Sequence, residues 1–161
     1  MKGLVVYDSV FSNTEKVAQA IGKALGSLGE VSTVQVKTVT PDQLAGLDVL
    51  VVGSPTRAFK HTEAVGGFIK KIPAGGLKGT TIAAFDTRIA VEETNSGFLK
   101  FMVKLFGYAA EPIAAKLVKK GGEPAGQPEG FIVTGTEGPL KEGELDRAAV
   151  WAGALLGKYF D

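Results

Sequence analysis

The sequence lacks cysteine and contains a single histidine, His61. Without cysteine there are no disulfides, thiolate metal sites, iron–sulfur clusters or cysteine nucleophiles. One histidine is too few for the usual metal centres, and the residues for a catalytic triad are missing. A Gly-Lys-Ser/Thr phosphate-binding sequence is also absent. Any redox chemistry must therefore use a bound cofactor.

Long apolar runs and a large excess of one charge are absent as well. No stretch approaches the roughly 18 consecutive apolar residues of a membrane helix, and the run at residues 4–7 is too short for the core of a signal peptide. The 18 basic and 17 acidic residues give a net charge of +1, with no dense basic block that would indicate nucleic-acid binding. We therefore expect a cytoplasmic protein that binds neither nucleic acid nor membranes.

The composition is that of an ordinary globular protein, with 161 residues, 45% apolar and 22% charged. A chain of about 150 residues buries roughly 70% of the surface that its unfolded form exposes, so it can fold without disulfides or a structural metal. No linker or shift in composition divides the sequence. We expect one domain covering residues 1–161.

The apolar pattern alternates between short buried runs and helical spacing. Strands are predicted at residues 4–7, 31–36, 47–52 and 80–85, and helices at residues 13–28, 62–72, 97–106 and 142–159. The apolar segments 113–118 and 131–133 indicate one fifth strand, broken by a Gly/Pro-rich loop. Alternating strands and helices predict an α/β protein, a doubly wound parallel sheet with helices on both faces.

Three polar segments directly follow predicted strands: residues 8–14, 54–59 and 86–88. In an open parallel sheet the loops after the strands emerge on one edge, where ligands bind, so these segments should converge. The first is rich in hydroxyl groups and opens a helix, whose backbone N–H groups could bind a phosphate without a lysine. The alternative for Ser12 is that it only caps this helix, with Glu15 completing a capping box.

Residues 5–15 resemble the FMN phosphate loop of the flavodoxin family, usually Ser/Thr-x-Thr-Gly-x-Thr. Ser9, Ser12, Asn13 and Thr14 fall at corresponding positions, while Phe11 replaces the usual hydroxyl and Ser12 the usual glycine. The Gly-Ser-Pro-Thr-Arg segment at residues 53–57 is similar to a loop of flavodoxin-like quinone reductases. The resemblance spans nearly the whole chain.

The resemblance implies a flavodoxin-like five-stranded sheet of order 2-1-3-4-5, with FMN lying across strands 1, 3 and 4. Residues 55–59 would then run along the isoalloxazine ring, and Phe59 is the candidate for stacking on it. The loop at residues 86–89 lacks the aromatic residue that many flavodoxins place on the other ring face. The expected FMN-binding residues are Ser9, Val10, Phe11, Ser12, Asn13, Thr14, Ser54, Pro55, Thr56, Arg57, Ala58, Phe59, Asp86, Thr87 and Arg88.

Arg57 and Arg88 are the charges of most interest. Two guanidinium groups beside the flavin would favour its anionic reduced states and raise its potential. The alternative is that both arginines are solvated or pair with Asp86 and Glu92. His61 could relay a proton near the flavin or be purely structural.

The leading functional hypothesis is an FMN-binding electron carrier that shuttles electrons between redox partner proteins, as a monomer or weak homo-oligomer. The main alternative is an FMN-dependent NAD(P)H or quinone reductase that acts as an oligomer. A third hypothesis is a flavin-free regulatory domain of the response-receiver type. That class has an acidic pair after its first strand and a lysine after its fifth, and this sequence shows neither.

Overall fold

The computed structural model describes residues 1–90 and 96–157 and contains one parallel sheet. Its strand order is β2-β1-β3-β4-β5, the order that the family resemblance implied, and a sixth strand, β6, also pairs with β4. The strands are β1 (Lys2–Tyr7), β2 (Glu30–Gln35), β3 (Val49–Pro55), β4 (Thr81–Ile89), β5 (Glu123–Pro124) and β6 (Glu129–Val133).

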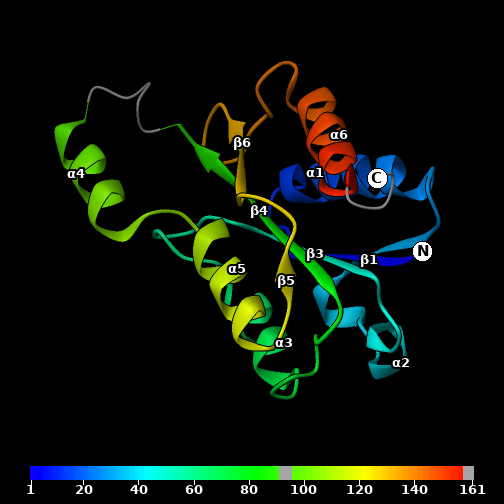
Figure 1. The fold of residues 1–161 in the computed structure, drawn as a ribbon. Coiled ribbons are helices and arrows are strands. Elements are labelled where there is room, and N and C mark those ends of the chain that lie inside the picture. Colours follow the sequence, from blue (N-terminus) through cyan, green and yellow to red (C-terminus); the bar gives the residue numbers. More distant parts are fainter. Residues whose placement is uncertain (91–95, 158–161) are drawn as a thin grey trace.

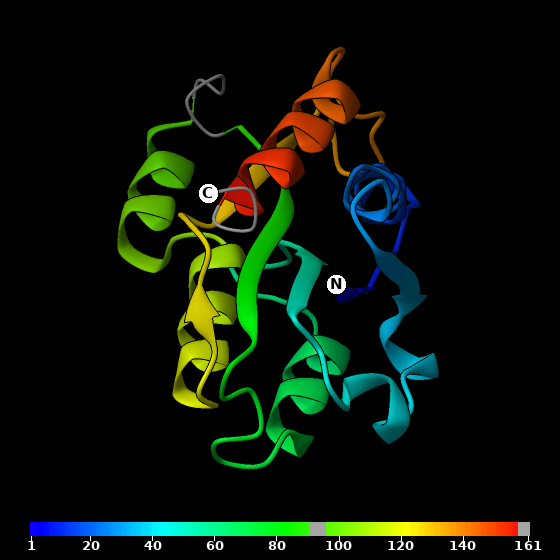
Figure 2. The ribbon, with the colours of Figure 1, turned by 45° about the vertical axis from the view of Figure 1, so that its right-hand side comes forward.

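Helices cover both faces of this sheet (Figure 1). Helices α1 (Asn13–Gly26) and α6 (Glu144–Leu155) pack on one face, and α3 (Glu63–Lys71) and α5 (Ala110–Lys119) pack on the other. The 3₁₀ helix η1 (Val36–Thr38) and the short helix α2 (Pro41–Leu44) lie in the connection from β2 to β3. Figure 2 shows the same layers from a second direction, and the doubly wound arrangement is confirmed.

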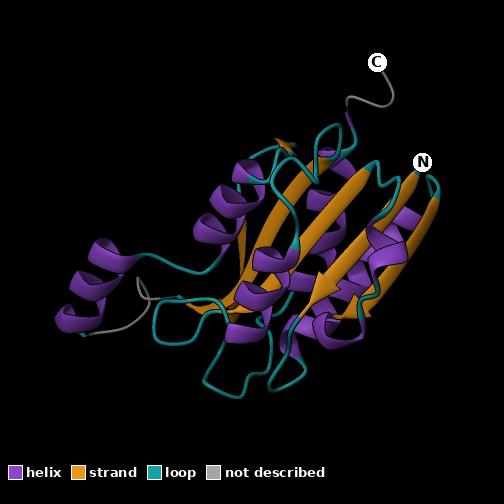
Figure 3. Ribbon diagram, turned by 90° about the horizontal axis from the view of Figure 1, so that it is seen from below, coloured by secondary structure: helices purple, strands orange, loops and turns teal. Residues whose placement is uncertain are grey.

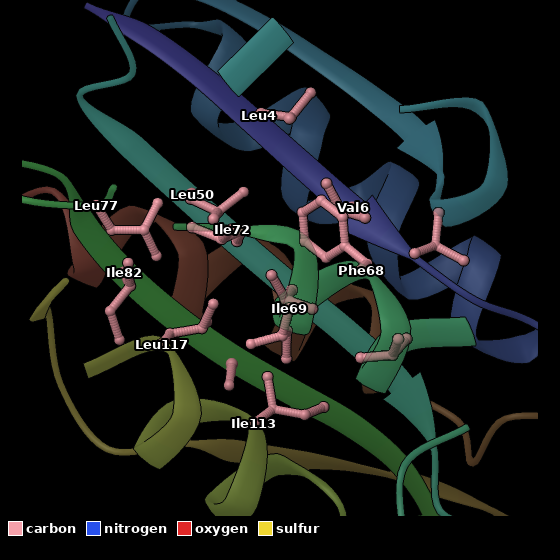
Figure 4. Close-up of a cluster of buried hydrophobic side chains, with 14 of the residues drawn as sticks. Leu4, Val6, Leu50, Phe68, Ile69, Ile72, Leu77, Ile82, Ile113 and Leu117 are labelled. Carbon is pink, nitrogen blue, oxygen red and sulfur yellow. The ribbon is translucent and has the colours of Figure 1, made fainter. Parts of the chain in front are cut away.

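Successive strand side chains point to opposite faces of the sheet, which produces two separate cores. Val5 and Val51 point toward α1 and α6 and are fully buried. Leu4, Val6 and Leu50 point the other way and pack with Ile69 of α3, as Figure 4 shows for this second core. Because β1 and β3 are apolar on both faces, they can occupy only the interior of a two-sided sheet.

The fifth position of the sheet differs in part from the prediction. β5 and β6 both pair with β4, one at each end, so the strand predicted at residues 131–133 is present. The prediction of strand structure for residues 113–118 was wrong, because these residues lie in α5. Ile113 and Leu117, one helical turn apart, are both fully buried, so helical spacing explains this apolar segment better than a strand.

Helix α4 (Gly97–Phe106) forms where the sequence predicted it, but none of its residues is buried. Figure 3 shows it standing away from the sheet. Its outward side chains Phe98, Phe101 and Leu105 are 70%, 60% and 63% exposed. No helix in the described residues is long and apolar enough to cross a membrane. The last helix, predicted to reach Tyr159, ends at Leu155, and residues 158–161 lie outside the described part.

Gly53 shows how tightly the centre of the sheet is packed. A β-carbon at this position would collide with the ring of Phe85, which faces Gly53 on β4 and belongs to the core under α1 and α6. We expect Gly53→Ala to lower the free energy of unfolding by about 1–3 kcal/mol, the usual cost of overpacking. Urea denaturation measures this change.

The control is Gly67→Ala, in the middle of α3, where an added β-carbon meets no atom of the described residues within 4 Å. That variant should be neutral or more stable by up to about 1 kcal/mol, because alanine favours the helix. Equal effects of the two substitutions would contradict the packing described for Gly53.

Candidate functional site

The ends of β1, β3 and β4 meet at one edge of the sheet and border a cavity of about 290 Å³, here called the loop cavity. All three predicted segments contribute to it, so their expected convergence is confirmed. The predicted residues that line it are Val10, Phe11, Asn13, Thr14, Pro55, Thr56, Arg57, Ala58, Thr87 and Arg88.

Five predicted site residues do not line the loop cavity: Ser9, Ser12, Ser54, Phe59 and Asp86. Ser54 is fully buried, and its hydroxyl oxygen accepts a hydrogen bond from the Thr62 N–H at 3.0 Å. Its own hydroxyl donates to the Pro55 carbonyl at 2.9 Å. Ser54 therefore holds the segment between β3 and α3 in place through hydrogen bonds to its backbone.

The backbone of residues 10–14 has a run of unused hydrogen-bond donors. Within the described residues, none of these consecutive N–H groups donates to a protein acceptor, whereas the neighbouring Ser9 N–H donates to Asp8 Oδ1 and the Glu15 N–H to Ser9 Oγ. The run ends at the start of α1, where the helix dipole adds positive potential. The segment therefore has the properties of an anion-binding loop.

The alternative explanation of Ser12, that its side chain caps α1 in a capping box, is wrong. Ser12 has a left-handed backbone with φ of 71° and makes no side-chain capping bond. The Glu15 carboxylate instead accepts a bond from the Tyr7 hydroxyl at 3.2 Å. Ser12 occupies the position where the flavodoxin pattern has glycine, and a left-handed conformation is the usual reason for a glycine.

Two side chains of this segment connect it to distant parts of the chain. The Thr14 and Thr87 hydroxyls form a buried hydrogen bond of 2.8 Å between the start of α1 and β4. Asn13 donates from Nδ2 to the Glu137 carbonyl at 3.1 Å, which holds the loop after β6. These two bonds therefore tie the first segment to β4 and to the loop after β6, which both border the loop cavity.

The sequence analysis predicted that residues 86–88 form a loop after the strand, but they are part of β4. They pair with Gly130, Phe131 and Ile132 of β6, which prolongs the strand past the predicted end at Phe85. A β-carbon at Gly130 would collide with the guanidinium of Arg88, so this glycine makes room for the arginine side chain.

Arg88 is neutralised by a buried carboxylate. Its Nε and one terminal nitrogen each donate to Asp86 at 2.7 Å, and the Ala110 N–H donates to the same carboxylate at 2.9 Å. Burial raises the pKa of Asp86, while the bonds from Arg88 act to lower it. The guanidinium also lies over the Tyr108 ring, 3.7 Å from its centroid. The pairing of Arg88 with Asp86 is confirmed, and Glu92 lies outside the described residues.

Arg57 is exposed and forms no ion pair within the described residues, and its guanidinium carbon lies 6.0 Å from the centroid of the Phe11 ring. It begins a tight hairpin in which the N–H groups of Arg57 and Lys60 each donate to the other residue's carbonyl. The two central residues, Ala58 and Phe59, have φ of 47° and 67°. Such turns normally carry Asn-Gly, so both residues are strained.

His61 contacts protein groups through both ring nitrogens. Nδ1 lies 2.8 Å from the Thr62 carbonyl, which can only accept, so Nδ1 carries the proton. Nε2 lies 2.6 Å from the Lys116 ammonium and accepts from it. His61 does not line the loop cavity, and its contacts favour the structural interpretation over a proton relay.

The sequence analysis missed Ile89, Val133 and Thr136, which also line the loop cavity. Val133 ends β6, and Thr136 belongs to the Thr-Gly-Thr segment that follows it. A strand followed by hydroxyl residues is the same signal that identified the first segment, so this pattern could have found Val133 and Thr136 but not Ile89. Tyr108, whose ring lies under the Arg88 guanidinium, does not follow a strand and could not have been found from this pattern.

The fold and the loop cavity together define a class of protein, the doubly wound α/β domains with a cavity at the ends of the parallel strands. The sequence profile of the family described as "Flavodoxin domain" matches residues 4–117. The chain belongs to the flavodoxin family, as its loop sequences had indicated.

Solved structures agree with this fold. A flavodoxin from the domain Archaea has 23% identity and a TM-score of 0.77, with all of both chains covered. Oxidised flavodoxin 2 from Bacillus cereus has 22% identity and a TM-score of 0.76, covering 98% of this chain and 99% of that one. The rubredoxin oxygen:oxidoreductase of Desulfovibrio gigas has 18% identity and a TM-score of 0.71, covering 96% of this chain but 35% of the longer one.

FMN is the cofactor of the flavodoxin family, as expected from the sequence. The residues present here fit both the phosphate and the ring system of FMN. The unused N–H donors of residues 10–14 suit a phosphate, and an adjoining cavity of about 300 Å³, here called the Tyr108 cavity, extends the loop cavity through Thr56, Ala58, Arg88 and Ile89. The phosphate need not meet a lysine, because backbone donors at a helix start suffice.

The strain at Ala58 can be measured directly. We expect Ala58→Gly to raise the free energy of unfolding by about 0.5–1 kcal/mol, because relief of the left-handed strain exceeds the entropy that glycine adds to the unfolded chain. Chemical denaturation of the flavin-free protein is the measurement.

Ala20→Gly, within α1, is the matched control and should lower stability by about 1 kcal/mol. If Ala58→Gly destabilised the protein as much as this control, the hairpin would not be strained.

Proposed function

We propose that this chain binds FMN in the loop cavity and the Tyr108 cavity and carries electrons between redox partner proteins. The observation that carries the proposal is the run of unused N–H donors at residues 10–14, which lies beside the cavity at the sheet edge. An orphaned row of backbone donors is costly unless water or a ligand satisfies it. A phosphate group satisfies several of these donors at once.

Each of the segments around the cavity has a role in this proposal. Residues 10–14 hold the phosphate, with Ser12 left-handed so that the loop can turn into α1. The ring system is enclosed by residues of the β3 and β4 ends, namely Pro55, Thr56, Ala58, Thr87 and Arg88. Ser9, Ser54 and Asp86 support these walls from behind, through bonds to Glu15, Thr62 and Arg88.

Bound FMN supplies the ability to accept and release electrons, and the protein sets the conditions. The only titratable or charged side chains on the wall of the loop cavity, within the described residues, are Arg57 and Arg88. Asp86 compensates the charge of Arg88 in a bidentate pair. Arg57 is therefore the residue that adds positive potential near the ring.

An FMN-dependent NAD(P)H or quinone reductase is the second candidate. A larger cavity of about 610 Å³, here called the His61 cavity, shares Ala58 with the loop cavity and could hold a small reactant. Electron transfer without a bound small substrate needs no such space. The flavin-free regulator is not retained, because membership of the flavodoxin family and the anion-binding loop both favour a flavin.

The purified protein should be yellow and release FMN on denaturation. After chemical reduction without oxygen, it should pass electrons to an acceptor protein such as a cytochrome within seconds, while NADH oxidation with a quinone present stays at the background rate. Absorbance at the flavin and haem bands follows both reactions. Rapid NADH consumption would contradict the electron-carrier function and support the reductase function. Failure to bind added FMN would exclude both functions.

Removing the free positive charge should shift the potential of bound FMN. We expect Arg57→Ala to lower it by roughly 20–40 mV for a one-electron step, equivalent to about 0.5–1 kcal/mol of Coulomb energy. Anaerobic redox titration measures the shift. Arg57→Lys keeps the charge and should retain the potential, so equal shifts in both variants would show that packing against Phe11 and not charge is responsible.

A further inference from the structure

The His61 cavity, about 610 Å³, borders the strained hairpin and shares Ala58 with the loop cavity. Its volume is within the range of about 300–1,000 Å³ that is usual for ligand sites. The FMN-binding role proposed for residues 10–14 and 54–59 does not use it, apart from the shared Ala58 and Phe59. It is therefore a second site that needs its own explanation.

One wall of the His61 cavity is aromatic. Phe59 and Phe106 stack with their ring centroids 6.0 Å apart and an interplanar angle of 29°. Phe106 is 55% exposed, so part of its side chain is accessible to a ligand. The left-handed backbone of Phe59 places its ring in this stack at a cost in strain, and such strain is typical of residues that serve a ligand. This wall suits a flat, aromatic molecule.

The His61 cavity also has a positively charged side. Among the described residues, Lys60 and Lys116 border the cavity together with one acidic residue, Glu63. The contact with His61 Nε2 fixes the Lys116 ammonium at 2.6 Å and uses one of its three N–H donors, which leaves two for a ligand. Gly66 allows this arrangement, because a β-carbon there would press on the His61 ring. The α3 N-terminus, capped by Thr62, adds positive potential.

We propose that the His61 cavity binds a small, planar, aromatic anion, stacked on Phe106 and paired with Lys116. Ala58 lines both the His61 cavity and the loop cavity, and Phe59 lines both the His61 cavity and the Tyr108 cavity, so the bound molecule would lie beside the proposed flavin site. The binding itself is independent of the proposed function, while its use as an electron donor or acceptor rests on that function.

Two matched pairs of variants test the proposal. Phe106 and Phe101 both lie on α4, but Phe101 is 60% exposed and does not line the cavity. Lys116 and Lys119 both lie on α5, and Lys119 does not line the cavity. The probes are 2-naphthoate and its uncharged amide, 2-naphthamide, and titration calorimetry measures their binding to the flavin-free protein.

We expect naphthoate to bind more tightly than naphthamide. Phe106→Ala should weaken naphthoate binding about 3- to 10-fold, the range that aromatic contacts usually contribute, while Phe101→Ala changes it less than 2-fold. Lys116→Ala should remove the preference for naphthoate over naphthamide, and Lys119→Ala should leave that preference intact. Phe106→Leu, which keeps an apolar side chain without a ring, serves as a second variant if Phe106→Ala does not fold.

Equal binding of the two probes, or no binding of either, would overturn the proposal. A larger effect of Phe101→Ala than of Phe106→Ala would also overturn it, and would indicate that the outer face of α4 is the contact surface for another molecule. FMN titration of the same proteins separates the two proposals: FMN binding without naphthoate binding refutes only this inference, and the converse refutes only the flavin function.

Discussion

Parallel pairing of β1, β3 and β4 is the constraint on which the site depends. The register aligns Tyr7 with Gly53 and Gly53 with Phe85, so the three strands end at the same edge of the sheet. Two buried apolar layers fix this register, because a shift by one residue would turn every core side chain to the opposite face. The hydrogen bond between Thr14 and Thr87 then joins the first loop to β4 across the edge. These contacts form the walls of the loop cavity.

The sequence predicted most of the fold because the buried strands are apolar on both faces and the helices α1 and α3 have one continuous apolar face. Local patterns could not show where β4 ends, since residues 86–88 are held in the strand by β6, more than 40 residues further along. The apolar segment 113–118 was ambiguous for a related reason: a short run fits a buried strand or a buried helix face equally well. Its helical state depends on packing against β4 and α3.

The candidate site was predictable in outline but not in its electrostatics. Residue types and loop positions pointed to the convergence of the three segments, and most of the named residues line the cavity. The difference between the two arginines was not accessible from sequence. Asp86 and Arg88 are separated by one residue on β4 and thus point to the same face, where Gly130 leaves room for their pair. Arg57 has no such carboxylate beside it in the described part of the structure.

The central claim is that backbone N–H groups of residues 10–14 hold the FMN phosphate, and amide NMR spectra of the flavin-free protein test it most directly. Addition of FMN should move the amide proton signals of these residues strongly downfield, as new hydrogen bonds to an anion do, while riboflavin, which lacks the phosphate, should leave them nearly unchanged. Both flavins should perturb the signals of Thr56 and Ala58. If riboflavin produced the same shifts at residues 10–14 as FMN, or if FMN left those signals in place, the loop would not be the phosphate site.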